Sequence, residues 1–302
     1  MLKRYLLRRL LHVIFLLASV SVLAFLLLTL APGDFLGEAK LNPQLSASTL
    51  AALRQRYGLN KSLPQKYLYW IESTARGDLG VSFAYDLPVS VLVWPRAFKT
   101  LQLSITALAF SWFLAVPLGV WSAAARRTLP DRILSALTST LVAIPELALA
   151  CLFLLVVVRS GAFHSSSPVL PVAILVLGAL PILVRHVRAA LLEAANQPFA
   201  SAARANGIRG RQLWFGWLLP AAANPLTSLF GLSVAGLISS SLVVEVFLGW
   251  PGLGPLFLEA IAARDLYLVI GPVMLSAVFL SLGTLLADVL LYALDPRIRI
   301  ES

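Results

Sequence analysis

Six apolar runs, separated by polar or basic residues, dominate the pattern of this 302-residue chain. The longer runs can cross the ~30 Å hydrocarbon core of a bilayer as helices. None shows the alternation of apolar and polar residues that is typical of membrane-barrel strands. Because backbone groups in hydrocarbon must pair within the segment, helices are predicted. The predicted spans are residues 10–30, 100–124, 133–158, 169–184, 226–244 and 270–294.

The fourth run is the weakest of the six, because it is short and contains Pro171 and Pro181. Proline removes a backbone donor and interrupts helical hydrogen bonding. We therefore expect neighbouring parts of the protein to support this span.

Composition strengthens the membrane prediction. Hydrophobic residues make up 59% of the chain and charged residues 13%, and the mean hydropathy is +0.86. The hydrophobic share is higher, and the charged share lower, than in a typical soluble domain. The first run follows a basic start, as a signal peptide would, but it is too long and "TLAPGDF" is not a convincing cleavage site. It is expected to remain as a helix.

The basic residues predict the orientation of the chain, because they favour the cytosolic side of a membrane. With the amino terminus inside, the two short outer loops hold only Arg159 and Arg264. Both termini are therefore predicted to be cytosolic. The net charge of +10 fits attraction to anionic lipid headgroups rather than nucleic-acid binding. The basic residues of the cytosolic segments are Lys3, Arg4, Arg8, Arg9, Arg126, Arg127, Arg132, Arg185, Arg188, Arg204, Arg209, Arg211, Arg297 and Arg299.

A small helical cap is predicted in the long outer segment, residues 31–99. Its first helix lies in "SASTLAALRQRYGL", with Ser46 or Ser48 as a possible N-cap and Gly58 as the stop. A second helix is predicted over residues 64–76, with Tyr67, Trp70, Ile71 and Thr74 on one face.

The loop at residues 185–225 contains the segment "FASAARANGIRGRQLWFGWLLP". This segment is rich in small and basic residues and is interrupted by glycines. Pro198 is expected to begin a new helix or to kink the preceding one. Gly207 tolerates positive φ, so it predicts an abrupt end to that short helix. Two interpretations remain open. The helix either lies on the membrane surface, or fits a groove on another protein.

This stretch resembles the cytoplasmic "EAA" loop of ABC-importer permeases, in which a short coupling helix is followed by a glycine and later by a leucine-proline element. Ala203, Arg204, Ala205 and Gly207 match its "TARAKG" form. Leu219 and Pro220 match its distal end, and Pro225 matches a second proline. The resemblance implies that the helix couples the permease to ATPase subunits. The implied coupling residues are Pro198, Phe199, Ala200, Ala203, Arg204, Ala205, Gly207, Leu219 and Pro220.

Matches to the dipeptide, oligopeptide and nickel permeases extend over almost the whole chain. They are "YLLRRLL", "FLLLTLAPGD", "GLNKSLPQKYLYW", "GDLGVSF", "VFLGWPGLG", "ARDL" and "LDPRIR". The loop departs from the family pattern at Gln197 or Pro198, where an acidic residue is usual. It also departs at Asn206, where lysine is common, and at Trp217, where histidine is common. The resemblance thus implies that a salt bridge or hydrogen bond to the ATPase subunit is missing here.

The resemblance implies an all-α membrane protein with the type I ABC-importer fold. That fold has six transmembrane helices, an outer cap between spans 1 and 2, and a cytoplasmic coupling-helix loop between spans 4 and 5. Residues 1–30 would form the cytosolic start and first span, 31–99 the cap, and 100–302 the core permease domain with its coupling loop at 185–225. The implied location is a bacterial inner membrane.

The resemblance also implies the partners. These are a second, homologous permease subunit, two cytoplasmic ATPase subunits and an extracytoplasmic solute-binding protein. The chain contains no GxxxxGKS or GxxxxGKT loop, so ATP and Mg are expected on the ATPase subunits and no cofactor on this chain. Relatives carry peptides, nickel chelates, glutathione or sugars, and the sequence does not choose among them.

Polar residues inside the spans are candidates for the translocation pathway, because lipid penalises them. Glu146 is a pathway candidate, or the partner of an arginine in the second permease subunit. Small residues of the fifth span, including Ser239 and Ser240, favour close helix packing over substrate contact. The family pattern suggests a gate or structural role for Glu245, and a subunit interface for Asp288.

Other classes of function are less consistent with the sequence. An ion-coupled secondary transporter would use Glu146, Glu245 and Asp288 as relay groups, but the two halves show no inverted repeat. A metal-dependent enzyme is not indicated, since the three histidines are scattered without ligand spacing. Cys151 is the single cysteine, so no internal disulfide is expected.

Overall fold

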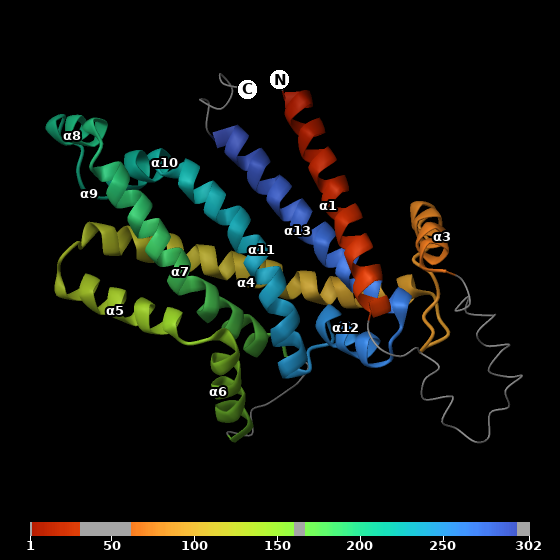
Figure 1. Ribbon diagram of the computed structural model, residues 1–302. Coiled ribbons are helices and arrows are strands. Elements are labelled where there is room, and N and C mark those ends of the chain that lie inside the picture. Colours follow the sequence, from red (N-terminus) through yellow and green to blue (C-terminus); the bar gives the residue numbers. More distant parts are fainter. Residues whose placement is uncertain (1, 31–61, 160–166, 295–302) are drawn as a thin grey trace, which may run out of the picture. The chain divides into compact units, whose positions relative to one another are not determined.

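The computed structural model describes residues 2–30, 62–159 and 167–294 (Figure 1). The first predicted cap helix, around Ser48 and Gly58, lies outside the described residues. The described elements are helical, apart from an isolated bridge between Val81 and Pro88. They are α1 (Leu2–Leu30), α3 (Leu63–Ala75), α4 (Val89–Ala124), α5 (Leu129–Ala143), α6 (Glu146–Arg159), α7 (Val169–Ala195), α8 (Pro198–Ala205), α9 (Gly210–Leu213), η2 (Trp214–Leu218), α10 (Leu219–Ala221), α11 (Ala223–Leu248), α12 (Leu253–Ala262) and α13 (Leu266–Leu294).

The described helices include five that are long and apolar enough to cross a membrane. The third predicted span is the exception, and its prediction as one continuous helix was wrong. It consists of α5 and α6, which meet at an angle of 96°, so the count reaches six only if this bent pair is one span. Pro145 explains the break, because its ring keeps the preceding residue extended, and Ile144 has φ −88° and ψ 121°.

The fourth span is longer than predicted. The helix α7 runs for 27 residues, from Val169 to Ala195. Pro171 lies in its first turn, where backbone donors have no partner within the helix, and so it removes no hydrogen bond. Pro181 lies inside the helix and is buried, as is Pro171. The expected support from neighbours is present, since α7 packs against α5, α6 and α11.

The chain forms two compact units. Unit 1 consists of Met1–Leu7, Leu101–Trp250 and Leu280–Ser302. Its core surrounds α7, with Val187 and Leu191 fully buried. In the same unit, α11 and α13 approach closely, because a Cβ added at Gly231 would lie 2.9 Å from Ala287 Cβ. This contact agrees with the packing role predicted for the small residues of the fifth run.

Unit 2 consists of Arg8–Thr100 and Pro251–Phe279. Its cap helix α3 begins one residue before the predicted start, and Ser62 and Gln65 form a capping box there. On the predicted inner face, Trp70 is 3% exposed and its ring lies 5.4 Å from that of Phe25. Ile71, predicted on the same face, is 41% exposed.

A buried acid, Asp265, joins two of the sequence motifs within unit 2. Its carboxylate accepts hydrogen bonds from the Ser82 hydroxyl (2.6 Å) and from the Ala84 N–H (2.9 Å). The other carboxylate oxygen accepts the Leu268 N–H at 3.1 Å and so caps the start of α13. The motifs "GDLGVSF" and "ARDL" therefore meet through one side chain.

The segment beside this acid makes a second contact with α12. The Tyr85 hydroxyl donates to the Glu259 carboxylate at 2.9 Å. This bond, followed by partial burial, raises the pKa of Tyr85 above its ordinary value of 10.0. Tyr85 is thus expected to stay protonated throughout the physiological pH range.

Replacing Asp265 with alanine is expected to destabilise unit 2 by roughly 2–4 kcal/mol. Buried hydrogen bonds to a charged group stabilise a fold more than other hydrogen bonds do. The thermal unfolding midpoint of the purified protein in detergent measures this. The control is Asp78→Ala, which removes one exposed bond to the Gly80 N–H. Equal midpoints for the two variants would contradict the structural role of Asp265.

Candidate functional site

The short helix α8 begins where the sequence predicted. Pro198 is its first residue, and the preceding Gln197 is extended, with φ −75° and ψ 152°. Proline suits this position, because its missing N–H would have no partner in the first turn of a helix. Figure 1 shows α8 as a separate short helix at the end of α7. Asn196 and Gln197 form the break between the two.

Gly207 ends α8 abruptly, also as predicted. Its φ is +83°, a left-handed conformation that favours glycine. The Gly207 N–H donates to the Arg204 carbonyl, and the Ile208 N–H donates to the Ala203 carbonyl, both at 3.0 Å. These two bonds form a Schellman motif, which satisfies the last carbonyls of the helix and fixes the direction in which the chain leaves it.

The predicted coupling residues divide between two faces of α8. Ala200 and Ala203 are 0% and 3% exposed, and belong to the core cluster that contains Val187 and Leu191 of α7. Their small side chains let α8 pack closely against its own chain. The other predicted coupling residues of α8, Pro198, Phe199, Arg204 and Ala205, are exposed, as are Ser201 and Ala202. Only this outer face can contact another protein directly.

The segment after α8 contains a π-helical turn that the sequence analysis missed. In η2 the Leu219 N–H bonds to the Trp214 carbonyl, five residues earlier. Pro220 explains the wider turn, since it has no N–H and its ring conflicts with a carbonyl four residues back. Leu218 is buried, Leu219 is half-buried and Pro220 is exposed. Of the two predicted distal residues, Leu219 alone packs against the core cluster of unit 1.

A partly buried ion pair joins α7 to the start of α5. The Arg188 guanidinium donates to both carboxylate oxygens of Asp131, at 3.0 and 2.9 Å. Asp131 also accepts the Ser122 hydroxyl at 2.6 Å and the Arg127 N–H at 3.0 Å. It is 4% exposed. The end of α4, the start of α5 and the end of α7 are thus joined through one carboxylate.

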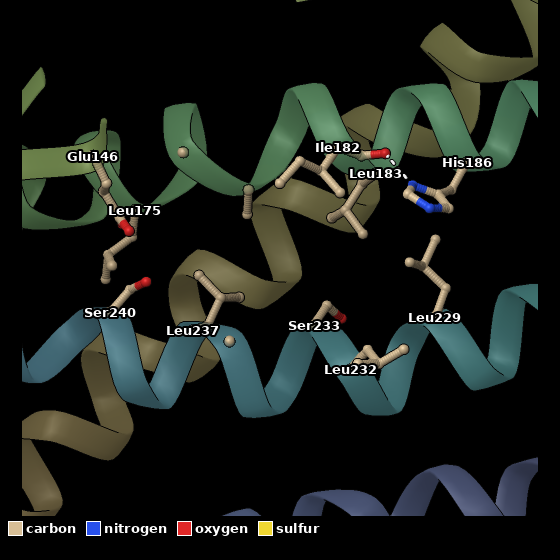
Figure 2. A pocket seen from close by; sticks show the side chains of 13 residues that line it. Glu146, Leu175, Ile182, Leu183, His186, Leu229, Leu232, Ser233, Leu237 and Ser240 are labelled. Carbon is tan, nitrogen blue, oxygen red and sulfur yellow. Dashed lines mark hydrogen bonds between the residues drawn. The ribbon is translucent and has the colours of Figure 1, made fainter. Parts of the chain in front are cut away.

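A second group of polar residues lines a cavity of about 420 Å³ between α7 and α11. Figure 2 shows Glu146 and Ser240 at one end of this cavity and His186 at the other. Most of the remaining lining is leucine, isoleucine, alanine and glycine. Glu146 is the first residue of α6, so the bend at Pro145 places its carboxyl here. Such size and lining are typical of small-molecule sites.

A close contact with α7 defines the position of the Glu146 side chain. A Cβ added at Gly178 of α7 would lie 3.1 Å from both Glu146 Cδ and Oε1, so the carboxyl packs against a bare glycine. The Ser240 hydroxyl of α11 lies on the facing side of the same cavity (Figure 2). A second cavity, of about 250 Å³, shares Glu146 and Ser240 and is also lined by Ser239. The structure therefore brings together three of the predicted pathway residues.

Two other candidates lie elsewhere. Glu245 is 0% exposed near the end of α11, and its carbonyl accepts the Trp250 N–H at 2.9 Å. Asp288 is partly buried on α13. Neither lines the cavities that contain Glu146. In the part of the chain that the structure describes, no three histidine, cysteine or acidic residues gather to hold a metal ion.

The sequence analysis missed three contributors to these sites. Asp131 was not singled out, and Arg188 was used only to predict orientation, although an acid and an arginine in membrane-adjacent segments are a signal for pairing. Gly178 gave no signal of its own, because an isolated glycine in an apolar run has many uses. Its contact with Glu146 depends on how α6 and α7 pack.

Comparisons with known proteins agree with the motif resemblance. Residues 115–300 match the model of "Binding-protein-dependent transport system inner membrane component", and residues 1–104 match the corresponding N-terminal model. The chain is 30% identical to an oligopeptide transport system permease of Bacillus subtilis, over 97% of this chain and 98% of that protein. A glutathione permease of Salmonella typhi (98% of each chain) is 30% identical, and a nickel permease of Staphylococcus aureus (97% and 91%) is 29% identical. An inward-facing MetNI methionine ABC transporter shares the fold, with TM-score 0.60, 22% identity, 68% of this chain and 96% of that one.

Proposed function

Because the chain belongs to the family of inner-membrane components of binding-protein-dependent transport systems, we propose that it forms half of the pathway through which a peptide or related small solute is imported. The relatives named above carry oligopeptides, glutathione and nickel. The chain is a permease component and not an enzyme. This assignment replaces the ion-coupled alternative.

The observation that carries the proposal is the construction of α8. It is short, it is held to α7 by Ala200 and Ala203, and it ends in a glycine motif that fixes its length. Its outer face, with Phe199 and Arg204, is exposed and would receive an ATPase subunit. A force applied to that face would be transmitted to α7, because the buried face of α8 is closely packed against it.

The remaining partners follow from the same assignment. A second permease subunit completes the pathway, and a solute-binding protein delivers the solute from outside. Two ATPase subunits bind ATP and Mg in the cytosol, where both termini of this chain also lie. Glu146, Ser239 and Ser240 line the pathway, Glu245 acts at a gate, and Asp288 faces the second permease subunit.

Uptake in proteoliposomes tests this function. The assembly is purified through a tag on this chain, its binding protein is recovered with it, and the bound solute is identified by mass spectrometry. Uptake of that solute is expected when ATP is supplied on the side of the membrane where the ATPase subunits lie. It is not expected with a proton gradient alone. Uptake driven by the gradient without ATP would overturn the proposal.

A further inference from the structure

We propose that the cavity at Glu146 binds an organic ammonium group of the transported solute, such as the free amino terminus of a peptide. This inference rests on the proposed function, and it adds the chemical class of the group that the pathway receives. The site consists of the Glu146 carboxylate, which packs against Gly178, the Ser240 hydroxyl and the open space beside Gly236.

Charge is the first argument. Glu146 is the only acidic residue that lines the cavity, and the single basic residue, His186, lies at the opposite end (Figure 2). Among the described residues, no lysine or arginine forms an ion pair with Glu146. In such apolar surroundings the ionised carboxyl is favoured only with a cation beside it, and it attracts that cation more strongly than an exposed carboxylate would, because less water screens the pair.

The shape of the site is the second argument. Gly178 leaves the space that a methyl group would fill, and the Glu146 carboxyl occupies that space. Gly236 lines the same cavity, one helical turn from Ser240, and an added Cβ there would meet no atom within 4 Å. The carboxyl therefore packs against α7, while the space beside Gly236 on α11 remains open to a ligand.

The hydrogen-bond acceptors of the site favour an ammonium group over other cations. An ammonium has three N–H donors and suits a carboxylate with a neighbouring hydroxyl as acceptors. A hard metal ion needs six or more oxygen ligands or several carboxylates, and the described residues offer no such cluster. The surrounding leucines suit the apolar part of an amine-bearing solute.

The charge preference of the cavity can be measured without knowing the solute. Ser239 lines the adjoining cavity beside Glu146 and is exposed, so Ser239→Cys in a Cys151→Ser background provides a reporter thiol. It is labelled in the detergent-solubilised assembly with a trimethylammonium or a sulfonate methanethiosulfonate. Each rate is normalised to the rate with a small free thiol. We expect the cationic reagent to react at least about tenfold faster.

Two variants separate the carboxylate from other sources of this preference. Glu146→Gln should bring the ratio of the two normalised rates, cationic over anionic reagent, close to one. Gly178→Ala should lower it without removing the charge, because the added methyl displaces the carboxyl. Gly236→Ala is the matched control and should leave the ratio unchanged, since its methyl has room.

Several outcomes would overturn the inference. They are a ratio near one in the parent protein, a ratio that survives Glu146→Gln, or a thiol that reacts with neither reagent. If Glu146→Gln instead strips the second permease subunit from the purified assembly, the carboxylate pairs with that subunit. ATP-driven uptake by the parent protein is a separate measurement, so each of these failures is distinguishable from failure of the importer function.

Discussion

Replacing Arg188 with leucine is expected to destabilise unit 1 by about 3–5 kcal/mol, because it leaves the Asp131 carboxylate buried without its cation. Asp131 is 4% exposed and receives two hydrogen bonds from that guanidinium. The thermal unfolding midpoint in detergent should fall by on the order of 10 °C. This effect is larger than the one expected for Asp265→Ala.

Three variants control this prediction. Arg185→Leu removes an exposed arginine from the same helix, and its effect should stay within about 0.5 kcal/mol. Arg188→Lys retains the charge but loses the bidentate hydrogen bond to the carboxylate. Its unfolding midpoint should therefore lie between those of the parent protein and Arg188→Leu. Asp131→Leu combined with Arg188→Leu should be less damaging than Arg188→Leu alone, because no buried charge remains unpaired. A midpoint for Arg188→Leu equal to that of Arg185→Leu would refute the buried pair.

The ion pair also bears on the proposed coupling. Arg188 lies ten residues before the start of α8, on the helix against which α8 packs. Asp131 lies on α5, the first arm of the broken span. If an ATPase subunit pushes on α8, this pair transmits the movement of α7 to that arm. Variants that keep the fold but weaken the pair, such as Arg188→Lys, should therefore lower uptake per ATP hydrolysed.

Gly207→Val is expected to abolish most of the stimulation of ATP hydrolysis by the loaded binding protein, while the chain still inserts into the membrane. Valine is strained at φ +83°, at a cost of at least 1–2 kcal/mol, which is enough to unwind the end of an eight-residue helix. The direction of the following chain would then change, and Ile208 would lose its bond to the Ala203 carbonyl. Hydrolysis by the reconstituted assembly, with and without binding protein, measures the effect.

The control at the same position is Gly207→Asn, because asparagine tolerates the left-handed conformation better than other residues. It adds a larger side chain at an exposed site where a Cβ meets no atom within 4 Å. Stimulation should therefore be largely retained. Loss of stimulation in both variants would mean that bulk at this surface is the cause. Retention in both would mean that the helix end has no role in coupling.

Much of the fold follows from local chemistry. The apolar runs placed the long helices, because a segment in hydrocarbon must satisfy its own backbone. Pro198 and Gly207 marked the two ends of α8 correctly, since a proline ring and a missing Cβ act on the chain at their own positions. Pro145 carried the same kind of signal for the bend between α5 and α6. The continuous apolar pattern around it outweighed that signal.

The sequence by itself thus determined the class of protein, most of its long helices and the limits of α8. Only the tertiary structure placed the Glu146 carboxyl against Gly178, and paired Asp131 with Arg188 at a separation of 57 residues. It also turned Ala200 and Ala203 inward, so that the outer face of α8 is narrower than the motif suggests. The physical reason is that a helix is specified by its own residues, whereas its rotation and its contacts depend on how several helices pack together.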